Sequence, residues 1–174
     1  MNLPDWDGLT SLDPTEVTSR LQAWLDDVMQ QKYGADEDEL LAELPEPLHA
    51  IWVLNWMDFE VTMGSLLGYF GNSHRRHANE AVSALRKIGA TGMASVLDRA
   101  IFVYNANADA WDQRDQELSE LDLYAVVRPY KDLPGVDELS ELTDRFRELE
   151  KHEQWHRRLA DFVHKAVAER ASRG

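Results

Sequence analysis

The chain has 174 residues, a length typical of one domain, and 44% of them are hydrophobic, which is enough apolar material for a buried core. This composition excludes an intrinsically disordered chain, and the absence of Cys excludes disulfides, thiolate metal sites and thiol nucleophiles. Thirty-two acidic residues against eighteen basic ones leave a net charge of −14, which disfavours direct binding to nucleic acid or to an anionic membrane and favours a basic partner.

Helical signals begin near the start of the chain. Asp13, Pro14 and Glu16 are typical of an N-cap, a first-turn proline and a capping-box partner. Apolar residues follow at helical spacing until Gly34, which predicts the end of this first helix. Residues 36–44 then predict a short acidic helix.

The most apolar part of the chain follows. From residue 47 to residue 63 nearly every position is apolar or aromatic, and a helix that is apolar all round is buried. We therefore expect a buried central helix here, ended by Gly64. The apolar stretch is interrupted by Asn55, Asp58 and Glu60, so it does not predict a membrane span, and the chain start lacks a signal peptide. These features predict a soluble, cytoplasmic protein.

The remaining segments are also helical. Asn72 predicts the cap of a helix that ends before Gly89, and Thr91 opens another. Residues 105–134 predict a loop around a short helix, and residues 139–166 return to the helical period, as one helix or two.

No segment alternates with period two for long enough to predict a strand. The expected fold is all-α, a single compact multi-helix domain (1–174) around a buried central helix. It comprises an acidic N-terminal helical segment (1–46), a core (47–105) and C-terminal helices (106–174).

His152, Glu153 and His156 match the H-E-x-x-H pattern of zinc hydrolases, in which two His on one helix face bind zinc and the Glu is the general base. The position of a third His in the longer form of this motif holds Phe162, and Trp155 lies where the apolar period requires core. A zinc hydrolase is therefore only a remote alternative. We expect no metal site, no cofactor and no catalytic residues.

A second His cluster, His74-Arg75-Arg76-His77, follows the expected cap. Two cations beside the imidazoles would oppose a metal ion. We expect a solvated first helical turn. The alternatives are that the cluster binds an anion or forms ion pairs with acids of the same chain.

Acidic residues are concentrated at the two ends of the chain. Residues 1–50 carry twelve acids and two bases, residues 51–110 carry five of each, and residues 111–174 carry fifteen acids and eleven bases. A helix rises about 1.5 Å per residue and B-DNA has a phosphate about every 1.7 Å of its axis, so a carboxylate-rich helix approximates a row of phosphates. A solvated face is the plain alternative. The candidate partner-binding residues are Asp36, Glu37, Asp38, Glu39, Glu43, Glu46, Asp109, Asp112, Asp115, Glu117, Glu120 and Asp122.

Residues 60–73 and 81–90 carry a family resemblance. The first segment resembles the E-V-x-N-G-G-F-x-Q-Y-F-x-N signature of the DNA mimic protein family, and the second resembles the helix after it, which ends in I-G-A. The matching residues are Glu60, Val61, Gly64, Tyr69, Phe70, Asn72, Ile88, Gly89 and Ala90. The departures from the signature are Met63, Ser65, Leu66 and Gly68.

The resemblance implies an all-α, acidic and often dimeric protein that offers carboxylates in place of phosphates to a DNA-binding protein. We interpret Glu60, Tyr69, Phe70 and Asn72 as structural: the two rings fill the core and Asn72 caps the following helix.

The leading hypothesis is a non-enzymatic DNA mimic that blocks the nucleic-acid-binding surface of a basic regulator or nuclease, and the resemblance adds a homodimer to this expectation. The alternative is an immunity or antitoxin-like protein that neutralises a basic toxin or nuclease. A neighbouring regulator gene would favour the first and a toxin gene the second.

Overall fold

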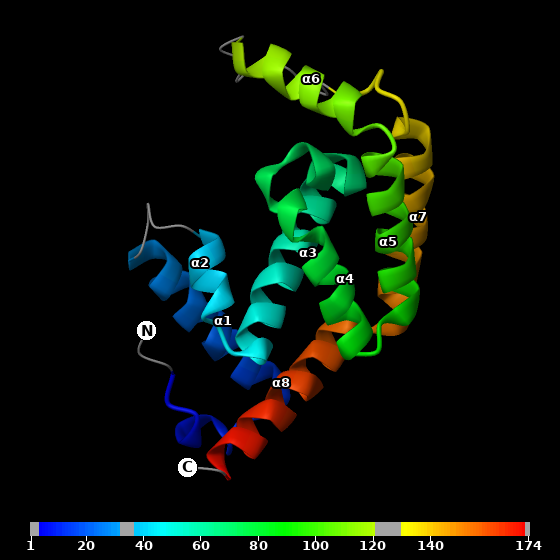
Figure 1. Ribbon diagram of the computed structural model, residues 1–174. Helices are drawn as coiled ribbons and strands as arrows, with labels where there is room; N and C mark the ends of the chain where they lie inside the picture. Colours follow the sequence, from blue (N-terminus) through cyan, green and yellow to red (C-terminus); the bar gives the residue numbers. More distant parts are fainter. Residues whose placement is uncertain (1–3, 32–36, 121–129, 173–174) are drawn as a thin grey trace.

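The computed structural model describes residues 4–31, 37–120 and 130–172. These residues form eight α-helices and two 3₁₀ helices, with no strand among them, which confirms the all-α prediction (Figure 1). In chain order they are η1 (Asp7–Leu9), α1 (Pro14–Gln31), α2 (Glu37–Ala42), α3 (Glu46–Gly71), η2 (Ser73–His77), α4 (Ala78–Lys87), α5 (Thr91–Asn105), α6 (Ala108–Glu120), α7 (Val136–Glu153) and α8 (Trp155–Ala171).

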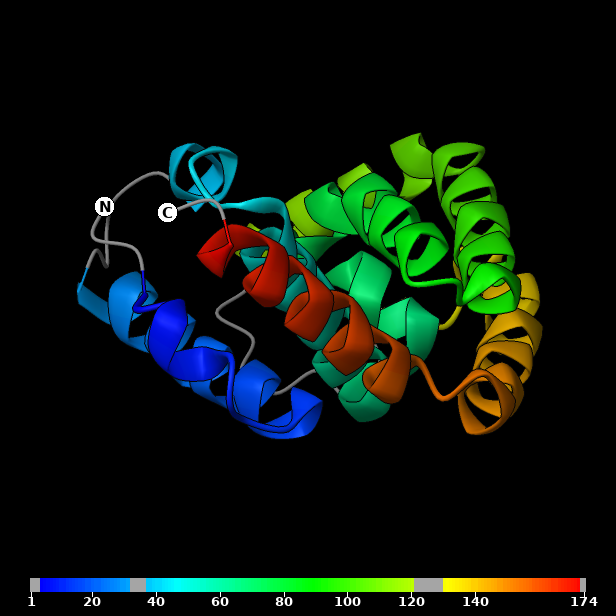
Figure 2. The same ribbon diagram turned by 90° about the horizontal axis from the view of Figure 1, so that it is seen from below.

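The long helix α3 lies in the middle of the structure and contacts α1, α4, α7 and α8. Helix α5 packs between α4 and α7, and α8 lies alongside α1, as the view from below shows (Figure 2). Buried apolar side chains from all of these helices form one continuous cluster. Among the described residues, no helix has both the length and the apolar character needed to cross a bilayer.

The predicted start of α1 is confirmed. The Asp13 carboxylate accepts hydrogen bonds from the backbone N–H groups of Thr15 (2.9 Å) and Glu16 (3.1 Å), as an N-cap does. The Glu16 carboxylate does not complete a capping box, because it pairs with Arg20 one turn further on. Gly34, expected to end this helix, lies outside the described residues.

Helix α3 is central, as predicted, but it is not buried all round. Phe59 and Met63 lie four residues apart and are 53% and 73% exposed. Composition alone therefore overestimated its burial. The helix also continues beyond Gly64 to Gly71, after a break at Ser65.

The break at Ser65 has φ 67° and ψ −178°, a conformation that is essentially restricted to glycine. Helix α7 bonds the backbone groups around it. The Thr143 hydroxyl accepts a hydrogen bond from the Leu66 N–H (3.1 Å), and the Arg147 guanidinium donates to the Val61 carbonyl (3.3 Å). The backbone groups around the break are therefore satisfied by α7, a helix that is distant in the sequence.

Two of the signature residues have the structural role expected of them. Tyr69 and Phe70 are each 1% exposed, and the Phe70 ring stacks on Tyr104 with centroids 5.1 Å apart. Asn72 precedes η2 at the cap position, but its side chain makes no cap bond and instead donates to the Glu60 carboxylate. The expected capping role of the Asn72 side chain was therefore wrong.

In the C-terminal half, one element differs from expectation and one open alternative is decided. The short helix expected within residues 105–134 is α6, which has 13 residues and is longer than expected. The C-terminal helical region is two helices, because Gln154 between α7 and α8 adopts a left-handed conformation with φ 48° and ψ 46°. The Arg158 guanidinium donates to the Glu153 carbonyl (2.7 Å) across this corner.

We predict that Ser65→Gly stabilises the protein. Glycine removes the steric cost of the left-handed backbone at this corner, a gain of about 1 kcal/mol in the free energy of unfolding after its own entropic cost. Chemical denaturation measures this. Ser95→Gly is the matched control, because Ser95 is exposed inside α5 and the same change there should destabilise by about 0.5 kcal/mol. Loss of stability in Ser65→Gly would contradict the strain at this corner.

Candidate functional site

The basic turn η2 is not the solvated first helical turn expected from the sequence. His77 is only 7% exposed, and the His74 ring stacks on Trp56 with centroids 4.1 Å apart. Arg75 and Arg76 both pair with carboxylates of the same chain. Of the alternatives open at the sequence level, pairing with internal acids is confirmed.

Arg75 joins η2 to α6. Its guanidinium lies 2.8 Å from the Asp115 carboxylate and 3.6 Å from that of Asp112, and it donates to the Phe70 carbonyl (2.9 Å). The Tyr130 hydroxyl donates to the other Asp115 oxygen (2.7 Å). Burial raises the pKa of the Tyr130 phenol above its ordinary value, and the bond to Asp115 raises it further, so the phenol stays a proton donor.

Arg76 joins η2 to α2 in the same way. It donates to the Glu37 carboxylate and lies 3.2 Å from Asp38, while the Trp52 indole N–H donates to Glu37 from α3 (3.2 Å). His77 lies 3.5 Å from Asp38 and 2.7 Å from Glu80 of α4. The first turn of α2 is therefore bonded to two other elements, η2 and α3, and His77 links the same site to α4.

The structure thus divides the twelve candidate acids. Asp36 and Asp122, and the side chain of Glu120, lie outside the described residues. Six of the remaining carboxylates form ion pairs with bases of the chain: Glu37, Asp38, Glu46, Asp112, Asp115 and Glu117. Glu39, Glu43 and Asp109 are exposed and form no ion pair with any described residue.

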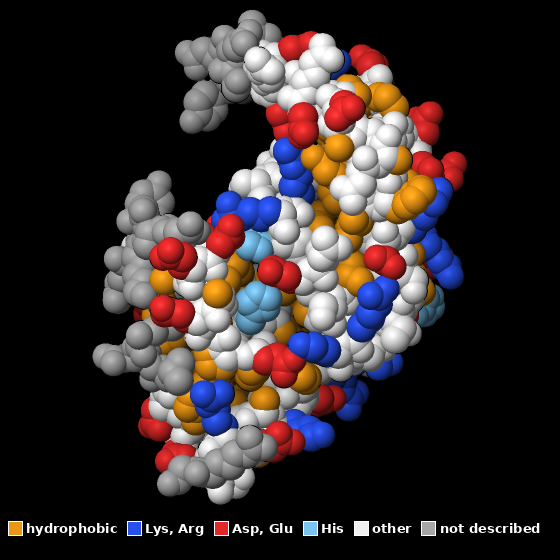
Figure 3. Space-filling model, in the orientation of Figure 1, with side chains coloured by type: hydrophobic (Ala, Val, Ile, Leu, Met, Phe, Trp, Pro, Cys, Tyr) orange, Lys and Arg blue, Asp and Glu red, His pale blue; other side chains and the backbone are white. Residues whose placement is uncertain are grey.

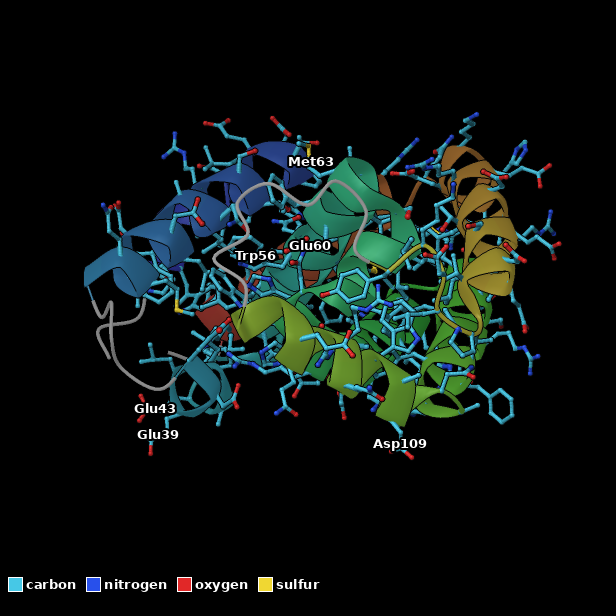
Figure 4. The ribbon with its side chains drawn as sticks, turned by 90° about the horizontal axis from the view of Figure 1, so that it is seen from above. Glu39, Glu43, Trp56, Glu60, Met63 and Asp109 are labelled. Carbon is cyan, nitrogen blue, oxygen red and sulfur yellow. The ribbon has the colours of Figure 1, made fainter. Side chains whose placement is uncertain are left out.

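These three unpaired carboxylates lie on one side of the molecule. Seen from above, Glu39 of α2, Glu43 in the turn after α2 and Asp109 of α6 project along the same edge, and Met63 projects from the opposite edge (Figure 4). Figure 3 shows acidic side chains on α2, at the left, and on α6, at the top, with basic side chains between the two helices. We call the described exposed acids of α2, of the turn after it and of α6 the acidic face: Asp38, Glu39, Glu43, Asp109, Asp112 and Glu117.

Sequence reasoning missed a second acidic surface. Asp137, Glu141, Asp144 and Glu148 of α7 are all exposed and recur every three or four residues, so they share the outward side of the helix. Glu148 pairs with Arg145 at 2.6 Å. Their spacing is visible in the sequence and would have identified this stripe.

A partly buried polar cluster explains the signature glutamate. Glu60 is 8% exposed within α3, and its carboxylate accepts from the Asn72 amide and lies 3.2 Å from the His74 ring nitrogen. His74 in turn stacks on Trp56. The cluster ties the part of α3 before the break to Asn72 and the start of η2, which supports the structural interpretation of Glu60.

The H-E-x-x-H pattern does not form a zinc-binding helix face. The break at Gln154 puts His152 on α7 and His156 on α8. The Glu153 carboxylate instead accepts hydrogen bonds from the first backbone N–H groups of α5, those of Gly92 (2.8 Å) and Met93 (3.3 Å). A Cβ on Gly92 would overlap this carboxylate, so glycine is needed for the approach. Glu153 therefore caps a helix.

Comparison with known proteins identifies one family. A family model described as DMP19-like protein matches residues 42–166, from α2 to α8. No curated protein and no solved structure matches the chain.

We predict that the purified protein carries no stoichiometric zinc. The two His of the pattern sit on different helices, and its Glu is engaged with the α5 backbone, so a three-ligand site is not assembled there. Elemental analysis of protein purified without chelator or added metal measures this. One zinc per chain, lost in His156→Ala, would contradict the prediction.

Proposed function

Because the chain belongs to the DMP19-like protein family, we propose that it is a non-enzymatic DNA mimic, whose acidic face occupies the DNA-binding surface of a basic regulator or nuclease. The observation that carries the proposal is the pair of acidic helices, α2 and α6, each held by an arginine of η2 and each presenting carboxylates on the same side of the molecule.

Fixed charges suit this function. A partner that binds DNA presents Arg and Lys at set positions, and carboxylates accept charge-assisted hydrogen bonds from them as phosphates do. Since Arg75 and Arg76 already hold α6 and α2, binding requires less ordering of the acidic face than two mobile segments would.

The internal ion pairs leave much of the acidic face accessible to a partner. The side chains of Asp38 and Asp112 are 60% and 65% exposed despite their pairing. Exposed ion pairs contribute only about 0–1 kcal/mol, so a partner's guanidinium can share or replace them at little cost. The unpaired Glu39, Glu43 and Asp109 add charge that is not neutralised within the described chain.

The test compares two triple variants with the same change in net charge. One neutralises the acidic face (Glu39→Gln, Glu43→Gln, Asp109→Asn), and the other neutralises the α7 stripe (Asp137→Asn, Glu141→Gln, Asp144→Asn). The partner is first isolated on immobilised wild-type protein at low salt and eluted at high salt. We expect the acidic-face variant to bind it at least about tenfold more weakly, mainly through slower association, and with a weaker salt dependence.

Duplex DNA should compete with the wild-type protein for that partner. Equal effects of the two triple variants would show that only total charge matters and would contradict the assignment of the acidic face. A ternary complex of partner, DNA and this protein would contradict mimicry itself.

A further inference from the structure

The side of the molecule opposite the acidic face carries exposed apolar side chains beside a groove. Phe59 and Met63 are 53% and 73% exposed, Trp56, one turn before Phe59, is partly buried, and Met63 also borders a separate depression that Lys131 and Arg147 line. Large exposed apolar side chains that adjoin a groove mark interaction sites more often than scattered ones do. Met63 projects from the edge opposite Glu39 and Asp109 in Figure 4.

The groove lies between α1, α3 and α8. A depression of about 400 Å³ is bounded by α1 residues from Thr15 to Asp26 together with Asn55 and His156, and it adjoins one of about 200 Å³ bounded by Trp56 and Phe59. The stretch from Thr15 to Asp26 rises about 16 Å along α1, which is about three helical turns. The dimensions therefore suit a short helix.

Three polar side chains of the groove form a chain of hydrogen bonds that runs from Asn55 through Gln22 to Asp26. The Asn55 amide donates to Gln22, and the Gln22 amide donates to the Asp26 carboxylate (2.6 Å). The chain therefore ends on an exposed acceptor, and the neighbouring Asp58 adds a second carboxylate 3.7 Å from His156. None of the described residues that line either depression is Lys or Arg. The acceptors at Gln22 and Asp26 therefore favour an occupant that donates hydrogen bonds and carries positive charge.

We propose that this groove is a docking site for an amphipathic helix of another protein, one that places apolar side chains against Trp56, Phe59 and Met63 and a Lys or Arg beside Asp26. This is the helix-in-groove mode of recognition, in which apolar anchors supply affinity and a charged contact sets the register. The proposal goes beyond DNA mimicry, because it uses the opposite side of the molecule and requires no carboxylate of α2 or α6.

The probe is a synthetic helical peptide of about three turns, with Leu along one side and Arg along the adjacent side. A scrambled peptide of the same composition controls for attraction to an acidic protein. Binding is followed by fluorescence anisotropy of the labelled peptide and by the Met63 methyl resonance of methionine-labelled protein, assigned with Met63→Leu. The peptide should bind saturably and shift the Met63 resonance, and the scrambled peptide should not.

Two matched pairs of variants locate the site. Phe59→Ser with Met63→Ser should weaken binding at least about tenfold, whereas Phe102→Ser, on an equally exposed ring of α5, should leave it unchanged. Asp26→Asn should weaken binding about threefold or more, whereas Asp27→Asn, exposed on the same helix but outside the groove, should not.

Three results would overturn the proposal. They are the absence of saturable binding, equal effects of the variants and their controls, and a homodimer that dissociates on Phe59→Ser with Met63→Ser, which would make a second copy the occupant. The triple variants of the acidic face should bind the peptide normally, so failure of this proposal and failure of DNA mimicry are distinguishable.

Discussion

The ion pairs made by two adjacent arginines organise the most highly charged parts of this protein. Arg75 pairs with α6 and Arg76 pairs with α2, although the chain between the paired residues spans about forty positions in each case. In a chain with a net charge of −14, two carboxylate-rich helices on one side of the core repel each other and their surroundings. The turn η2 supplies positive charge between them and sets where each helix lies.

The position of η2 depends in turn on the corner in α3. The Glu60 carboxylate binds Asn72 and faces His74, so the part of α3 before the corner is joined to the start of η2 through a partly buried polar cluster. Helix α7 supports the same corner from the other side, because Thr143 and Arg147 bond backbone groups on either side of Ser65. Polar groups bonded to one another in this way favour one arrangement of helices. The family signature thus encodes the geometry that presents the acids.

Local features of the fold could be predicted from the sequence, and features that depend on distant partners could not. The Asp13 cap, the apolar period of α5 and the burial of Trp155 follow from residues within one or two turns, which sequence spacing reveals. The corners at Ser65 and Gln154 occur at residues that carry no glycine signal, and bonds to remote residues support both. The role of Glu153 in the H-E-x-x-H pattern also depends on a remote partner, since its carboxylate binds the start of α5, 61 residues earlier in the chain.

Counting acids located the two acidic helices but not the roles of their carboxylates. Glu37 and Glu39 are two positions apart, yet one is bonded to α3 and η2 while the other is exposed on the acidic face. Which acid is bonded and which is exposed depends on how the helix is oriented, and a run of acidic residues in the sequence does not show that orientation. The acidic stripe of α7, by contrast, could have been predicted from the three- and four-residue spacing of its acids alone.

The claim that the two arginines hold the acidic helices is tested most directly by hydrogen–deuterium exchange, measured along the chain in the double variant Arg75→Gln, Arg76→Gln. The account predicts faster exchange in α2 and α6 and unchanged exchange in α4 and α5. Arg145→Gln, which removes an ion pair between side chains that are each 58% exposed, should change neither. Unchanged protection of α2 and α6 in the double variant would contradict the account.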